Sequence, residues 1–241
     1  MVDVEFGQGL AVLTIDRPHA RNAIALETME QLEKALDAAE GASALVITGA
    51  GDRAFVSGGD LKELSSIRTE ADAAAMARRM RTICDRLASF PAPVIAALNG
   101  HALGGGAEVA VAADIRIAAD DIKIGFNQVA LEIMPAWGGV ERLAALVGKS
   151  KALLLAGTGT VMDAAEAERI GLVDVVLPRS SFDDGWRSLA RSLANLPAAE
   201  IKRVISGVSP DEAIASFARL WVADAHWQAA ERVMNRSANP R

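Results

Sequence analysis

The sequence predicts an α/β fold, and three observations carry that prediction. Short apolar runs alternate with segments of helical periodicity, as where a run at 44–48 follows a helical pattern at 26–40. The run at 44–48 is continuously apolar, which is typical of a strand buried on both faces. Glycine-rich turns at 57–60 and 99–108 stand between apolar runs and the helices expected after them.

Composition and charge narrow the class of protein. The chain has 241 residues, of which 51% are hydrophobic, and this suits one large domain or one domain with an appendage. The formal net charge of −6 argues against a general nucleic-acid surface. No apolar run reaches the roughly 20 residues of a membrane helix, and Met1–Glu5 lacks the features of a signal peptide. We therefore expect a cytoplasmic protein with no membrane or nucleic-acid partner.

Residue counts argue against metal and disulfide chemistry. Cys84 is the only cysteine, so neither an intrachain disulfide nor a cysteine-based zinc site can form. The three histidines, His19, His101 and His226, are scattered, and we expect no metal site.

The first elements follow from their patterning. The runs 2–6 and 10–15 flank Gly7-Gln8-Gly9, which is a hairpin signal. Apolar residues at spacings of three and four predict an amphipathic helix over 26–40. Beyond the strand at 44–48 and the glycine turn, the next helix is expected to start at Leu61–Leu64.

The stretch Asn99–Glu108 reads as the junction between a strand and a buried helix. It follows the apolar run 94–98 and contains three consecutive glycines, which let the backbone turn tightly. The first N–H groups of the following helix lack intrahelical partners and can stabilise an oxyanion. Glu108 lies about one helical turn beyond Gly105, where it can act as an acid or base. The alternative is a turn that packs a helix tightly on a strand, with Glu108 favoured by the helix dipole.

The C-terminal half is predicted to be mainly helical. Val140, Leu143, Ala144 and Val147 share one helical face. Asp163 and Glu166 resemble a helix start, and a strand is expected over 172–177. From Pro178 onward we expect helices, with Pro197 and Pro210 as breakers.

Two motifs together resemble a known family. Ala54–Glu63 reads AFVSGGDLKE, and Asn99–Glu108, some forty residues later, reads NGHALGGGAE. This pair resembles the crotonase family of enoyl-CoA hydratases and isomerases. The likeness continues, in the family's order, through residues 17–23, 135–143, 148–150, 155–159 and 165–173, and covers residues 1 to about 178.

The resemblance implies a fold, a substrate and an assembly. Residues 1–178 are expected to form a crotonase-like spiral of ββα units. Residues 179–241 are expected to form a C-terminal helical region that covers the active site and builds a homotrimer or hexamer. The implied substrate is an acyl-CoA thioester, and no separate cofactor is implied because coenzyme A is part of the substrate.

The resemblance also implies site residues. One backbone N–H from each glycine turn, at Gly59 and Gly105, would grip the thioester carbonyl, each donor being worth roughly 3 kcal/mol by analogy with other oxyanion holes. The segment lining the coenzyme path matches Ser57, Asp60, Leu61 and Lys62. Lys62 or Arg21 could meet coenzyme phosphates, although both also suit ordinary solvated side chains.

The second acid–base position departs from the hydratase pattern. Glu108 matches the first of the family's two glutamates, but Gln128 stands at the second, and an amide cannot exchange protons near neutral pH. Glu132, four residues on, is an alternative carboxylate. Trp137 stands where the family often has a small residue. It either narrows the acyl pocket or is only a packing residue of the protein interior.

The resemblance implies an enzyme that stabilises a thioester enolate, of the enoyl-CoA hydratase or isomerase type, in fatty acid metabolism. One alternative is a malonyl-type acyl-CoA decarboxylase of the same family, for which one carboxylate suffices. Another is a weakly catalytic CoA-binding subunit.

Overall fold

The structure, a computed structural model, describes residues 1–237 and contains a larger sheet of six strands. The strands lie in the order β1-β2-β3-β5-β7-β10, with β1 antiparallel to β2 and the remaining pairs parallel. Their bounds are β1 Val2–Gly7, β2 Leu10–Ile15, β3 Ala44–Gly49, β5 Val94–Leu98, β7 Ile115–Ala119 and β10 Val175–Leu177. The predicted hairpin and the strands at 44–48 and 94–98 are confirmed, whereas the strand expected over 172–177 is shorter.

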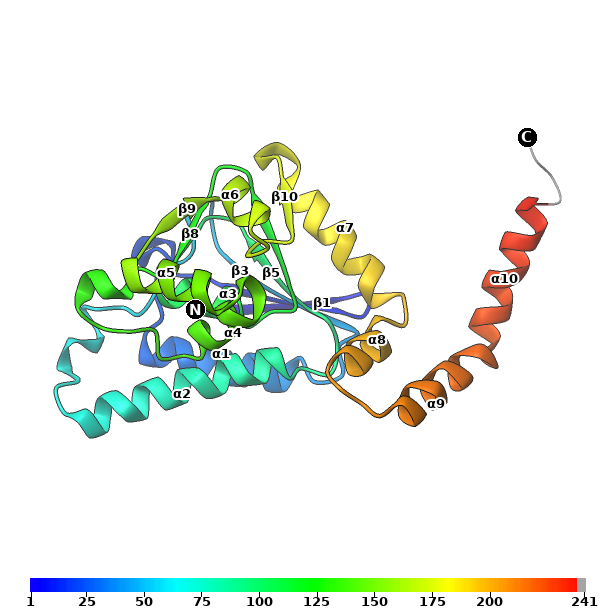
Figure 1. Ribbon diagram of the computed structural model, residues 1–241, viewed down its shortest axis with the longest axis horizontal. Helices are drawn as coiled ribbons and strands as arrows, with labels where there is room; N and C mark the ends of the chain where they lie inside the picture. The colour runs from blue at the N-terminus through cyan, green and yellow to red at the C-terminus, as the bar shows by residue number, and fades with distance from the viewer. Residues whose placement is uncertain (238–241) are drawn as a thin grey trace. The chain divides into compact units, whose positions relative to one another are not determined.

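A smaller sheet has the order β4-β6-β8-β9. Its strands are β4 Ala54–Val56, β6 His101–Leu103, β8 Lys123–Gly125 and β9 Val161–Asp163. The chain passes three times from the larger sheet to the smaller one and then into a helix, in α2 (Glu70–Ala88), α3 (Gly105–Ala110) and α4 (Gly139–Val147) (Figure 1). This winding confirms the predicted α/β class and the spiral of ββα units.

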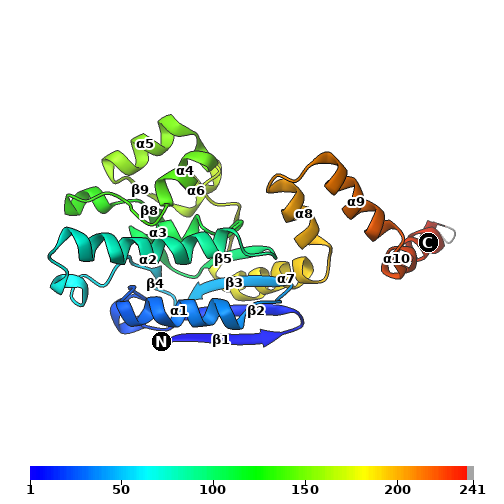
Figure 2. The same ribbon diagram turned by 90° about the horizontal axis from the view of Figure 1, so that it is seen from below.

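The helices α1 (Leu26–Ala38) and α2 run side by side (Figure 2). α1 confirms the predicted amphipathic helix, since Met29, Leu32 and Leu36 are buried. The prediction of a helix start at residues 61–64 is wrong. A turn and the 3-10 turn Leu64–Ser66 occupy this region, and α2 begins at Glu70 because the Thr69 side chain caps it by accepting the Asp72 N–H.

Three further helices complete the first compact unit, which runs from Met1 to Leu196. They are α5 (Lys149–Thr158), α6 (Ala164–Arg169) and α7 (Phe182–Ala194). The predicted start of α6 is confirmed, because the Asp163 carboxylate accepts the Glu166 N–H at 2.8 Å. The α7 helix belongs to this unit because it buries Phe182, Trp186 and Ala190 against the larger sheet.

The second unit begins at Pro197 and contains α8 (Ala198–Ile205), α9 (Pro210–Trp221) and α10 (Asp224–Ser237). Pro197 and Pro210 both stand at helix starts, which fits their expected role as breakers. The cover and trimerisation role expected for residues 179–241 stays a prediction. Over residues 1–237, no helix has the length and apolar character needed to cross a membrane.

Candidate active site

The two predicted glycine turns lie against each other. A Cβ atom at Gly58 would stand 3.4 Å from the backbone nitrogen of Gly105. Gly58 has a φ of +105° and Gly104 a φ of +56°, and such positive values favour glycine because an L side chain would be strained there. The turn that follows β4 and the turn that begins α3 therefore meet at their main chains.

Two backbone N–H groups are left free where the turns meet. The Ile24 N–H donates to the Gly58 carbonyl, and the Ile24 carbonyl accepts from the Asp60 N–H, both at 2.8 Å. This pairing does not use the N–H of Gly59, which lies between the two. Gly105 is the first residue of α3, where an N–H has no intrahelical partner. Among residues 1–237, neither N–H donates a hydrogen bond. The pair can hold an oxygen atom that gains negative charge.

Glu108 lies one turn further along α3 and is only 2% exposed. Its Oε2 accepts the N–H of Trp137 at 2.7 Å and of Gly139 at 3.0 Å, and its Oε1 accepts Nε2 of Gln128 at 2.9 Å. Burial raises the pKa of Glu108 above its usual value, although these donors act in the opposite direction. A carboxyl group with a raised pKa in a buried site is suited to proton transfer.

The structure brings Gln128, not Glu132, to Glu108. Gln128 is buried at the start of a 3-10 turn (Gln128–Leu131). Glu132 is exposed at the end of that turn, with a left-handed φ of +57°. The described contacts therefore place one carboxylate and one amide together.

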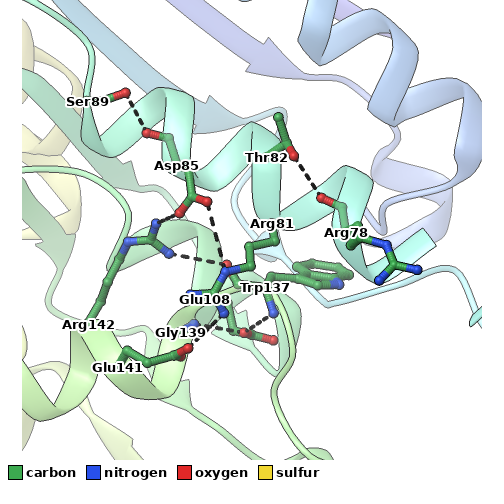
Figure 3. Close-up of polar contacts among 10 residues, drawn as sticks. All are labelled: Arg78, Arg81, Thr82, Asp85, Ser89, Glu108, Trp137, Gly139, Glu141 and Arg142. Atoms are coloured by element: carbon green, nitrogen blue, oxygen red, sulfur yellow. Dashed lines mark hydrogen bonds and ion pairs between the residues drawn. The ribbon is translucent and has the colours of Figure 1, made fainter. Parts of the chain in front are cut away.

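The Trp137–Gly139 loop is held by Arg142 of α4. Nη1 of Arg142 donates to the Trp137 carbonyl at 3.2 Å, while Nη2 pairs with Asp85 of α2 (Figure 3). Because the same loop supplies two N–H donors to Glu108, Arg142 is a positioning residue for that carboxylate. Neither Asp85 nor Arg142 was singled out by the sequence.

Replacing Arg142 by Met is expected to raise the pKa of Glu108 further, because the loosened loop would hold the ionised carboxylate less firmly. Carbon-13 NMR titration of the glutamate carboxyls, with Glu108→Gln to assign the signal, measures this. Arg79→Met is the control, since Arg79 also anchors α2, through Glu33 of α1 at 2.7 Å, but does not hold the loop. An unchanged Glu108 titration in Arg142→Met, or an equal change in both variants, would contradict this assignment.

The Trp137 side chain covers the start of α3. It is 7% exposed, and a Cβ atom at Gly105 would lie 2.5 Å from its Cη2 atom. The indole therefore lies directly over the residue that offers one of the two free N–H groups, and it bounds the space available there.

A cavity of about 480 Å³ is lined by Ser57 and Leu103, which come from the two glycine-rich stretches. Two of the predicted binding residues, Ser57 and Arg21, line it. It also contains residues that the sequence did not single out for binding, namely Arg53, His101, Leu103 and Arg179. Arg179 pairs with Asp121, and Asp52 also lines the cavity, whereas the exposed Arg21 and Arg53 form no ion pair among the described residues. The two guanidinium groups without an ion pair, Arg21 and Arg53, suit an anionic ligand in this cavity.

The other predicted binding residues differ in their surroundings. The Asp60 carboxylate pairs with Arg17 at 3.0 Å. Burial raises the pKa of Asp60, but backbone hydrogen bonds and Arg17 outweigh this effect, so the pKa lies below its usual value. Leu61 and Lys62 are exposed on the turn after Asp60. The Asp60 side chain is thus engaged within the protein, while Leu61 and Lys62 face outward.

Known proteins resemble the chain over most of its length. Residues 5–219 match the family profile described as enoyl-CoA hydratase/isomerase. The chain is 38% identical over 194 residues to short-chain-enoyl-CoA hydratase of Clostridium acetobutylicum, with 79% of this chain and 74% of that protein covered. It is 40% identical over 177 residues to crotonyl-CoA hydratase of Syntrophomonas wolfei, with 72% and 68% covered.

Solved structures share the fold. The crystal structure of an enoyl-CoA hydratase from Thermoplasma volcanium has 31% identity and a TM-score of 0.84, with 96% of each chain covered. That of an enoyl-CoA hydratase from Bacillus anthracis has 28% identity and a TM-score of 0.84, with 100% of this chain and 96% of that chain covered.

Proposed function

The chain belongs to the enoyl-CoA hydratase/isomerase family, the crotonase family, and on that premise we propose that it hydrates 2-enoyl-CoA thioesters of short acyl chain. One observation carries the proposal: a buried carboxylate, Glu108, lies on the helix whose first residue offers a free N–H beside that of Gly59. A proton-transfer group thus stands next to donors that can polarise a carbonyl.

The chemistry requires both parts. When water adds to C3 of the enoyl group, charge moves into the thioester carbonyl oxygen, and the N–H groups of Gly59 and Gly105 would stabilise that enolate. Glu108 would act as general acid and base. Gln128 would orient the reacting groups, because it cannot exchange a proton itself.

The cavity lined by Arg21, Arg53 and Ser57 supports coenzyme binding. Two exposed guanidinium groups there can meet the phosphates of coenzyme A, and Lys62 lies on the same turn as Ser57. Coenzyme A would enter as part of the substrate, with no separate cofactor. A cytoplasmic location, a role in fatty acid metabolism and a homotrimer or hexamer stay predictions.

Mass spectrometry of the purified protein with four thioesters tests the proposal. The panel is crotonyl-CoA, a longer trans-2-enoyl-CoA, a trans-3-enoyl-CoA and methylmalonyl-CoA. We expect crotonyl-CoA to gain one water. Shift of the double bond in the 3-enoyl thioester without hydration would indicate an isomerase, loss of carbon dioxide from methylmalonyl-CoA would indicate a decarboxylase, and no turnover would indicate a CoA-binding subunit.

Replacing Trp137 by Leu is expected to broaden the accepted acyl length, because the indole bounds the space over Gly105. We expect kcat/KM for an eight-carbon 2-enoyl-CoA, relative to crotonyl-CoA, to rise by about 10-fold, as one or more added methylenes gain room in an apolar pocket. Trp137→Phe keeps a ring and is the control. If the ratio is the same in all three proteins, Trp137 is a packing residue only.

A further inference from the structure

Arg17 joins the two segments that meet at Gly59. Its Nη1 donates to the Ala23 carbonyl at 2.5 Å, and its Nη2 pairs with the Asp60 carboxylate at 3.0 Å. Asp60 directly follows Gly59 in the chain. Ala23 directly precedes Ile24, which forms a parallel β-bridge with Gly59. One guanidinium group therefore spans this bridge, with a hydrogen bond to one segment and an ion pair to the other.

The bridge sets the direction of the Gly59 N–H. Its two hydrogen bonds, both of 2.8 Å, join Ile24 to the residues on either side of Gly59, namely Gly58 and Asp60. In a parallel bridge the carbonyl before the central residue and the N–H after it face the partner, so the central N–H faces away. The Gly59 N–H is thus free to donate to a ligand, and its direction depends on the bridge.

The bridge has little support of its own. It lies outside the strands of both sheets, and no further backbone hydrogen bond continues the pairing within residues 1–237. Arg17 can supply the missing support, because a guanidinium group is planar and holds its N–H donors in a fixed fork. A single Arg17 side chain can therefore keep the two segments in register.

Arg17 is itself held in place by Asn22. The Arg17 N–H donates to Asn22 Oδ1 at 3.0 Å, and the Arg17 carbonyl accepts the Asn22 N–H at 2.9 Å. Asn22 is only 1% exposed, and its Nδ2 donates to the carbonyl of Ala54 in β4 at 2.7 Å. The Arg17 and Asp60 side chains are each 13% exposed, so water competes little for their pairing. The guanidinium group is thus fixed at both ends.

From these contacts, and resting on the function proposed above, we infer that Arg17 is a positioning residue that aims the Gly59 N–H at the thioester carbonyl. A backbone donor stabilises a developing oxyanion only when it points at that oxygen. Arg17 does not line the cavity that contains Arg21 and Arg53. It therefore acts through Asp60 and the main chain, without contacting the coenzyme.

The test measures how strongly the bound carbonyl is polarised. The ligand is butyryl-CoA with carbon-13 at the thioester carbonyl, and infrared difference spectroscopy gives its stretching frequency. In Arg17→Met we expect about half of the shift seen in the unaltered protein, because one of two donors is loosened, and a kcat for crotonyl-CoA hydration about 10-fold lower. The affinity for free coenzyme A should not change, since Arg17 does not contact it.

Asp60→Asn is the second variant, because it removes the charge that Arg17 pairs with and leaves the hydrogen bond to Ala23. It should reproduce the smaller carbonyl shift. The double variant should lose no more than the larger single loss, since both changes break the same interaction. Glu63→Gln is the matched control, because Glu63 also meets Arg17, at 2.5 Å, but its side chain is 50% exposed and it is not in the bridge. Its shift should equal that of the unaltered protein.

A full carbonyl shift in both Arg17→Met and Asp60→Asn would overturn the inference. An equal loss of shift in Arg79→Met, which breaks an ion pair between α1 and α2, would overturn it too, because the effect would then be general. Should Arg17→Met fail to fold in urea titrations, the result for Asp60→Asn decides.

Failure of the inference and failure of the proposed function give different results. If the unaltered protein neither hydrates an enoyl-CoA nor shifts the carbonyl frequency, the proposed function fails. If it does both, and the Arg17 and Asp60 variants match it, only the assignment of Arg17 fails.

Discussion

Glu108→Gln is expected to lower kcat for crotonyl-CoA hydration by about 10²- to 10⁴-fold, the usual contribution of general acid–base catalysis. The amide matches the carboxylate in shape, and its oxygen can still accept the Trp137 and Gly139 N–H groups once the Gln128 amide turns its oxygen toward the new NH₂ group, but it cannot accept a proton. Binding of butyryl-CoA should change little, because the proposed carbonyl donors are the backbone N–H groups of Gly59 and Gly105. Steady-state kinetics and inhibition by butyryl-CoA measure the two effects separately.

Glu132→Gln is the control for this variant, since Glu132 is the nearby carboxylate that lies exposed and apart from Glu108. Its kcat should stay within about 2-fold of the unaltered protein, a change expected for an exposed side chain outside the site. A Glu108→Gln protein with nearly full activity would remove Glu108 from the mechanism. A large loss of kcat in Glu132→Gln would instead assign Glu132 a catalytic role.

The pH profile should carry the signature of Glu108. Burial raises its pKa above the ordinary glutamate value of 4.5. Water activation requires the ionised form, so activity should be present at higher pH and fall as the pH drops through that raised pKa. An acidic limb of kcat below pH 4.5 would contradict this environment for Glu108.

Gly106→Ala is expected to lower the free energy of unfolding by about 3 kcal/mol or more, at the upper end of the usual effect of overpacking. A Cβ atom there would lie 2.6 Å from the carbonyl carbon of Val56, and the obstacle is backbone that cannot rotate away. The α3 helix would have to move off β4, and the free N–H of Gly105 would move with it. Urea unfolding monitored by tryptophan fluorescence gives the free energy.

Gly7→Ala provides the matched substitution, because nothing lies within 4 Å of a Cβ atom at Gly7 and its φ is ordinary. Its stability should change by less than about 1 kcal/mol. Equal stability of the two variants would show that α3 does not pack on β4 as closely as described.

The parts of the fold that were predicted are those with local signals. In the helix at 26–38 and the buried strands at 44–49 and 94–98, the buried residues are those that the apolar pattern of the sequence marks. That pattern was therefore sufficient to predict these elements. The start of α2 was missed because Leu61–Leu64 has helical composition, whereas the Thr69 cap decides where the helix begins. The strand β6 was missed because it has only three residues and lies inside the glycine stretch.

The candidate site was predicted unevenly for a similar reason. Glu108 and Gln128 were found because their side chains are distinctive in the sequence. The N–H groups of Trp137 and Gly139 that hold Glu108 leave no trace in side-chain identity, although the glycine pair Gly138-Gly139 marks a turn. The Asp85–Arg142 pair joins residues 57 positions apart, and no local pattern reports such a contact.

The proposed chemistry depends on two backbone N–H groups that polarise a thioester carbonyl beside Glu108. The most direct measurement is infrared difference spectroscopy of butyryl-CoA labelled with carbon-13 at the thioester carbonyl and bound to the unaltered protein, since this saturated ligand cannot be hydrated. We expect the carbonyl stretch to move to lower frequency than in water, because both donors withdraw electron density from the oxygen. A frequency equal to that of the free thioester would contradict it.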